Sequence, residues 1–221
     1  ANGIQFNNTV AGESFSLAGN AIDLTGDITS ADAAGTIDDS IALGLQLTGG
    51  DRAISTGTDH NLAVSGVISE DGSARGLSKA GTGTLTLAGS NTYAGETAVT
   101  AGVLSITNAA SLGTTAAGTT VAAVSQLAIS GGITVAEPLS LNGNGNTNNS
   151  GALLSSGANT VSGQITINNG GVRINTVDGS APLTVTGGVV DAGTAGSDST
   201  FAGNFVFNSA IDVGDFNIRV A

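Results

Sequence analysis

The feature that most constrains the fold is a series of very short strands separated by turn residues, with no helical segment between them. Within residues 76–106, polar and apolar side chains alternate in Thr84–Leu87, in Ala98–Thr100 and again in Val103–Ile106. A period of two is typical of a strand with one buried face. Glycine and asparagine stand between these strands, as tight turns require. Three strands in about thirty residues predict roughly one coil of a β-solenoid.

The same pattern of short strands separated by turn residues extends along the whole chain, from Ile4–Phe6 to Phe216–Val220. Apolar residues do not recur with helical spacing over any useful length, so the sequence predicts an all-β fold with little or no helix. A β-sandwich would use longer strands and clearer hairpin turns. We therefore expect one continuous parallel β-solenoid over residues 1–221, with roughly eight to ten coils and a length of about 40–50 Å. Residues 27–39 and 48–61 are more polar and are expected to be loops.

The amino-acid composition and charge of the chain exclude several classes of function. The net charge is −12 and the chain has only five lysines and arginines, so it cannot supply the basic cluster that nucleic acid or an anionic membrane surface requires. It has no cysteine, which excludes disulfides and thiolate metal sites. No apolar run is long enough for a transmembrane helix. No signal peptide is recognisable, and Ala1 stands next to a predicted strand, so we expect a mature chain or a piece of a longer one.

One segment resembles a known family. The run GLSKAGTGTLTL at residues 76–87, followed by Asn91-Thr92-Tyr93, Ala101-Gly102 and Leu104, is similar to the autotransporter-associated β-strand repeat, best matched over Gly76 to Ile106. Lys79 and Tyr93 stand where that pattern expects them. The resemblance implies a right-handed parallel β-helix and an extracellular or bacterial cell-surface location. It implies no activity, because the repeat is a scaffold element.

Candidate catalytic groups are few. Paired carboxylates can perform acid–base chemistry on polysaccharides, and the close pairs are Asp23 with Asp27, Asp38 with Asp39, and Glu70 with Asp71. Acidic residues are also common in solvated turns, which is the reading we favour. The single histidine, His60, stands in a polar stretch beside Asp59 and is expected at the surface. We therefore predict no catalytic residue and no cofactor.

Two further polar patterns are candidate ligand sites. Asp178-Gly179-Ser180 and Asp191-Ala192-Gly193 are oxygen-rich turns, but the nonapeptide calcium repeat is absent, so no metal is expected. The run Asn142–Asn149 could form an inward ladder, bind sugar hydroxyls or form a flexible corner. An aromatic platform for sugar stacking could use only Tyr93 in the interior of the chain.

The two ends of the solenoid are the remaining candidate sites. All six phenylalanines stand near the termini, and the end coils of a solenoid expose unpaired strand edges and half a core. Head-to-tail stacking of copies does not close on itself and would build a filament. Alternatively, the chain is a segment of a longer protein and the aromatics fill wider end coils. The candidate assembly residues are Ile4, Phe6, Phe15, Phe205, Phe207, Phe216, Ile218 and Val220.

Together with the bacterial-surface location that the resemblance implies, these patterns predict a non-catalytic structural rod of a bacterial surface or biofilm matrix protein. Its partner would be itself, stacked head-to-tail, or the adjacent repeats of a longer chain. One alternative is an adhesin module that binds a glycan or a surface protein. A second alternative is a polysaccharide lyase or hydrolase built on a β-helix.

Overall fold

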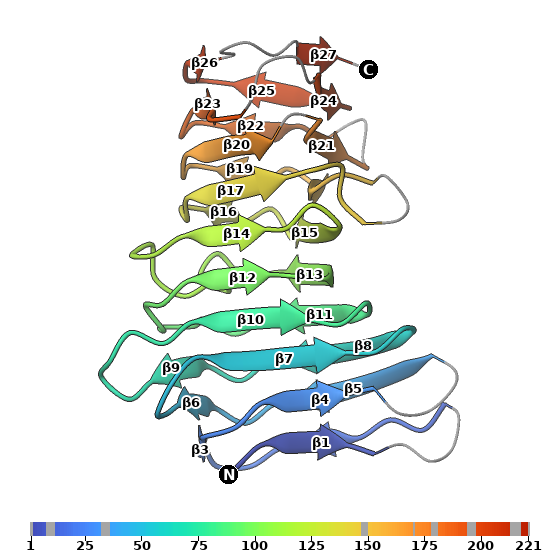
Figure 1. Ribbon diagram of the computed structural model, residues 1–221, viewed down its shortest axis with the longest axis vertical. Helices are drawn as coiled ribbons and strands as arrows, with labels where there is room; N and C mark the ends of the chain where they lie inside the picture. The colour runs from blue at the N-terminus through green and yellow to red at the C-terminus, as the bar shows by residue number, and fades with distance from the viewer. Residues whose placement is uncertain are drawn as a thin grey trace.

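The protein is a β-solenoid whose chain climbs from the N-terminus at one end to the C-terminus at the other as a right-handed coil (Figure 1). The computed structural model describes residues 2–7, 12–31, 36–146, 150–169, 171–177, 181–193, 198–212 and 218–220. Secondary structure in these residues consists of strands, with no helix among them. The described ranges therefore also contain no helix that could cross a membrane. The predicted all-β parallel solenoid is confirmed.

Two long sheets run the length of the rod, and each contains ten described strands. Sheet A consists of β1 (Ile4–Phe6), β4 (Ile28–Ser30), β7 (Arg52–Thr56), β10 (Leu77–Ala80), β12 (Thr97–Val99), β14 (Thr119–Val121), β17 (Leu139–Asn142), β20 (Ile165–Asn169), β23 (Val189–Asp191) and β26 (Ile211–Asp212). Sheet B consists of β2 (Ser16–Leu17), β5 (Ile37–Ile41), β8 (His60–Val64), β11 (Thr84–Leu87), β13 (Gly102–Ile106), β15 (Ser125–Ser130), β18 (Leu153–Ser156), β21 (Arg173–Thr176), β24 (Ser199–Ala202) and β27 (Ile218–Val220).

Two short sheets form the third side of the coil. The first contains β3 (Ile22–Leu24), β6 (Leu45–Leu47) and β9 (Ile68–Glu70). The second contains β16 (Thr134–Val135), β19 (Thr160–Val161), β22 (Leu183–Val185) and β25 (Phe205–Phe207). At a spacing of about 4.8 Å, ten stacked strands give a rod of about 45 Å.

The core is a set of apolar ladders that run along the rod axis. All strand pairings between the described strands are parallel, and in sheet B they align one leucine of each coil with the next: Leu62, Leu85, Leu104, Leu127 and Leu153. All five side chains are buried. Burial of such ladders, at about 25 cal/mol per Å² of apolar surface, stabilises each coil chiefly through its two neighbours.

The segment around the repeat is longer than one coil, which corrects the prediction from the sequence. Residues 76–106 hold two strands of sheet A, β10 and β12, and two strands of sheet B, β11 and β13. The prediction missed β10 because Lys79, a charged residue, occupies one of its two inward positions. The two polar stretches expected as loops also contain strands: β4 and part of β5 in residues 27–39, and β7 with the start of β8 in residues 48–61.

Candidate functional sites

The first coil carries an apolar hollow at the N-terminal end of the rod. Ile4 and Phe6 of β1, together with Phe15 and Leu17, line a space of about 410 Å³. Phe6 is almost buried, whereas 45% of the Phe15 surface is exposed. Strand β1 pairs with β4, and the described residues place no strand on its other side. Three predicted assembly residues, Ile4, Phe6 and Phe15, are therefore brought together at one face.

The opposite end of the rod holds an aromatic cluster. Phe201 of β24 packs edge-on against Phe205 and Phe207 of β25, with ring centroids 5.5 and 5.3 Å away. Phe201 is buried and the other two rings are partly buried, so these side chains fill the interior of the last coils. Of the remaining predicted assembly residues, Phe216 lies outside the described residues. Ile218 and Val220 belong to β27, and only their backbone is described.

The first two acidic pairs contribute three carboxylates that accept hydrogen bonds within the fold, while Asp23 is exposed in β3. Asp38 and Asp39 are adjacent in β5 and therefore point to opposite faces of the sheet. Asp38 Oδ1 accepts a hydrogen bond from Asn61 Nδ2 on the outside, whereas Asp39 is buried and accepts one from the Phe15 amide. Asp27 Oδ1 accepts one from the amide of Ala53 in a neighbouring coil. Asp39 corrects the prediction of solvated turns because it is buried in a strand, whereas Asp27 and Asp38 are exposed.

The third acidic pair is part of a corner that links coils. Glu70 Oε2 accepts hydrogen bonds from the amides of Arg75 and Ala94, both at 2.9 Å. Asp71 forms a salt bridge with Arg75 and accepts the Gly49 amide. The Arg75 guanidinium and the Gly49 amide lower the pKa of Asp71 to about 2. Both carboxylates thus accept hydrogen bonds that hold the corner together.

His60 lies in the interior and not at the surface, contrary to the prediction. It forms a buried cluster with Ser30 and Asp39, which sequence reasoning missed because the three residues come from three different strands. Ser30 Oγ donates to Asp39 Oδ2 at 2.8 Å and lies 3.3 Å from His60 Nδ1. Nucleophilic catalysis needs the histidine between the serine and the carboxylate, whereas here the serine stands between the other two. The cluster is buried and its hydrogen bonds link neighbouring strands.

The two marker residues of the repeat also point inward. Lys79 Nζ donates hydrogen bonds to the carbonyls of Ala80, Gly81 and Ala101 at 2.8, 2.8 and 3.1 Å. Burial of this ammonium lowers the pKa of Lys79 to about 8. Tyr93 is fully buried, its hydroxyl lies 2.7 Å from Thr97 Oγ1, and burial raises its pKa. Tyr93 therefore cannot serve as a platform for sugar stacking.

The calcium and asparagine patterns are only partly described. Asp178-Gly179-Ser180 lies outside the described residues, and so do residues 147–149 of the Asn142–Asn149 run. Asp191 Oδ1 accepts a hydrogen bond from the Gly193 amide within its own turn. In the ranges that the structure describes, no group of three or more histidine or acidic side chains gathers as a metal site would require.

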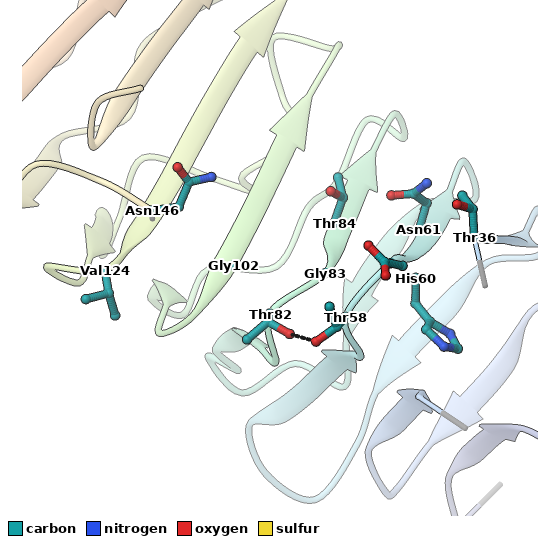
Figure 2. Close-up of a pocket in the computed structure, with 11 residues that line it drawn as sticks. Thr36, Thr58, His60, Asn61, Thr82, Gly83, Thr84, Gly102, Val124 and Asn146 are labelled. Carbon is teal, nitrogen blue, oxygen red and sulfur yellow. Dashed lines mark hydrogen bonds between the residues drawn. The ribbon is translucent and has the colours of Figure 1, made fainter. Parts of the chain in front are cut away.

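A polar groove of about 420 Å³ follows the corner where sheet A turns into sheet B. Figure 2 shows that its lining side chains come from successive coils, with Thr36 toward one end and Val124 and Asn146 toward the other. The remaining lining residues are Thr58, Asp59, His60, Asn61, Thr82, Gly83, Thr84 and Gly102. Sequence reasoning did not predict this groove, because its members become neighbours only when one coil stacks on the next.

The fold and the repeat define the class of protein. Residues 77–106 match the passenger-associated-transport-repeat family, so the chain is a β-solenoid that carries an autotransporter passenger repeat. The chain is also 35% identical over 100 residues to the Adhesin BmaC autotransporter of Brucella suis biovar 1 (strain 1330). That match covers 43% of this chain and 3% of the relative. No solved structure matches the chain significantly. The two matches point to a surface-exposed or secreted protein.

Proposed function

We propose that this chain is a non-catalytic structural rod of a bacterial surface or matrix protein. The observation that carries the proposal is the continuous parallel pairing of ten strands in each long sheet. The hydrogen bonds between these strands run along the rod axis, so bending or stretching the rod would strain many of them at once. His60 and the carboxylates of Asp27 and Glu70 support a non-catalytic role, because hydrogen bonds within the fold engage them.

The proposed rod extends by stacking one end coil on another. The hollow lined by Ile4, Phe6 and Phe15 is apolar, and an added coil would cover it and pair with β1 and β2. The rings of Phe205 and Phe207 are only partly buried, and β25 is the edge strand of its sheet among the described strands, so they provide some apolar surface near the opposite end. In a purified sample, the coil that stacks on the hollow must come from another copy. Such contacts are heterologous and lead to open filaments.

Sedimentation velocity of the purified chain, over a range of concentrations at physiological salt, tests this stacking. We expect the wild-type chain to associate, and Phe15→Asp to weaken the association at least about tenfold because an unpaired carboxylate would be buried in the contact. Val67→Asp is the matched control, because Val67 is also 45% exposed but lies on the side of the rod, between β8 and β9. A wild-type chain that stays monomeric, or a Phe15→Asp variant that associates normally, would contradict the proposal.

Adhesion is the second candidate function. The match to a protein named as an adhesin favours it, because the shared region covers 43% of this chain. A rod built of repeated coils also presents side chains along its length at regular spacing. Adhesion is compatible with the structural role, since one face of a rod can bind a ligand while its ends bind other coils.

A further inference from the structure

We propose that the corner groove binds a neutral oligosaccharide through hydroxyl and amide groups, without aromatic stacking. The inference rests on the adhesive candidate above for its biological setting, and on the groove itself for its chemistry. The volume of about 420 Å³ lies within the range of about 300–1,000 Å³ that is usual for small-ligand sites. The groove therefore fits a short segment of a glycan chain.

Hydroxyl and amide groups that line the groove keep hydrogen-bond donors and acceptors that the fold does not use. Thr58 Oγ1 and Thr82 Oγ1, from adjacent coils, lie 2.8 Å apart, and Figure 2 shows this hydrogen bond. One hydroxyl donates to the other, so the pair retains one O–H donor and several lone pairs. Asn61 Nδ2 donates to Asp38 Oδ1, which leaves its amide oxygen and its second N–H for a ligand. Sugar hydroxyls need this mixture of donors and acceptors.

Asp59 is the most unusual residue of the groove. Its φ is 63°, and it is the only non-glycine residue with a positive φ in the part of the chain that the structure describes. Aspartate tolerates this left-handed conformation better than most residues with a side chain, and it occurs here in the turn between β7 and β8. The exposed Asp59 carboxylate is the single charged group of the lining. A carboxylate can accept two hydrogen bonds from vicinal sugar hydroxyls.

The composition of the lining disfavours other classes of ligand. It contains no lysine or arginine, and the chain has a net charge of −12, so phosphates, nucleic acids and acidic sugars would be repelled. Val124, which is 67% exposed, is its only large aliphatic side chain, enough to contact one C–H face of a sugar but not to hold an apolar ligand.

An extended peptide is also a poor fit for this groove. Addition of a peptide strand needs an unpaired sheet edge. Backbone groups at this corner are already paired between coils, as in the bonds from the Gly83 amide to the Thr56 carbonyl and from the Val103 amide to the Gly83 carbonyl. A neutral polyhydroxylated ligand is the class that remains.

Saturation-transfer NMR and calorimetry on the whole chain test the inference. The neutral probes are maltotriose, cellotriose, mannotriose and triacetylchitotriose, and a hyaluronan tetrasaccharide is the acidic probe. We expect at least one neutral trisaccharide to bind, and the acidic probe not to bind. Asp59→Gly suits the positive φ and preserves the fold, so its expected effect, about three- to tenfold weaker binding, reports the carboxylate itself.

The double variant Thr58→Val with Thr82→Val removes both hydroxyls with little change of shape, and we expect it to weaken binding by a similar factor. Thr184→Val is the control, because Thr184 lies in β22 of a different sheet. The inference is overturned if no neutral probe binds, if only the acidic probe binds, or if the groove variants bind like the control. These outcomes would leave the stacking proposal intact, because stacking is tested at Phe15.

Discussion

Glu137 lies inside the solenoid with little hydrogen bonding to stabilise its charge. Only 3% of its surface is exposed, and Thr119 Oγ1 donates to Glu137 Oε1 at 3.4 Å. Burial raises the pKa of this carboxyl to about 7. The folded protein therefore binds this proton more tightly than the unfolded chain, whose carboxyl has the ordinary pKa of about 4.5. Below pH 4.5 the carboxyl is protonated in both states and does not lower the free energy of unfolding. As the pH rises from 4.5 toward 7, the carboxyl ionises in the unfolded chain but not in the folded protein, so the free energy of unfolding falls.

Glu137→Gln removes this titration while keeping the shape of the side chain. We expect the variant to match the wild type in unfolding free energy at pH 4 and to exceed it by on the order of 2 kcal/mol at pH 8. Urea unfolding at pH 4, 6 and 8 measures the difference. Glu96→Gln is the control, because Glu96 is exposed. Equal pH dependence in wild type and Glu137→Gln would show that the Glu137 carboxyl is solvated.

At the scale of the strands and turns, polar side chains link coils where the backbone ladders are interrupted. Asn159 is buried; its Oδ1 accepts the Ile133 amide at 3.0 Å, and its Nδ2 donates to the Ser156 carbonyl at 2.9 Å. Asn91 similarly accepts the Ile68 amide at 2.8 Å and donates to the Ser111 carbonyl at 2.6 Å. The side-chain amide of each asparagine thus binds backbone groups at a corner that have no partner in a neighbouring strand.

Asn159→Ala tests the importance of these links. We expect a loss of about 2–3 kcal/mol of unfolding free energy, because the substitution removes several hydrogen bonds and leaves buried backbone groups without their partner. Asn175→Ala is the control, since Asn175 faces outward in β21 and should change stability by less than about 0.5 kcal/mol. Chemical denaturation of both variants measures the difference. A loss at Asn159 no larger than that at Asn175 would mean that water satisfies these groups equally well.

The sequence predicted the strands better than the sites, for a physical reason. Alternation of polar and apolar residues reports strand geometry directly, so Thr84–Leu87 was predicted with the bounds that the structure gives. The inward positions of Lys79 and Asp39 were not predictable, because each depends on partners contributed by other strands or turns. The groove escaped prediction for the same reason, since Thr58 and Thr82 meet only through the stacking of coils.

At the scale of the whole molecule, stability and shape both follow from coil-on-coil stacking. Contacts are made almost entirely between neighbouring coils. The hydrophobic core is therefore continuous along the rod, and coils could be added at either end without changing the interior. That residues 1–221 form one continuous unit stays a prediction, and a single cooperative transition in thermal unfolding would support it. Two separated transitions would instead divide the chain into independently folding segments.

Cryo-electron microscopy of the purified chain at physiological salt tests the proposed rod most directly. The fold predicts narrow rods of about 45 Å with an axial repeat near 4.8 Å, joined end to end into unbranched filaments. Isolated rods of that length would retain the solenoid and overturn the stacking of end coils. Globular particles without the 4.8 Å repeat would contradict the solenoid itself.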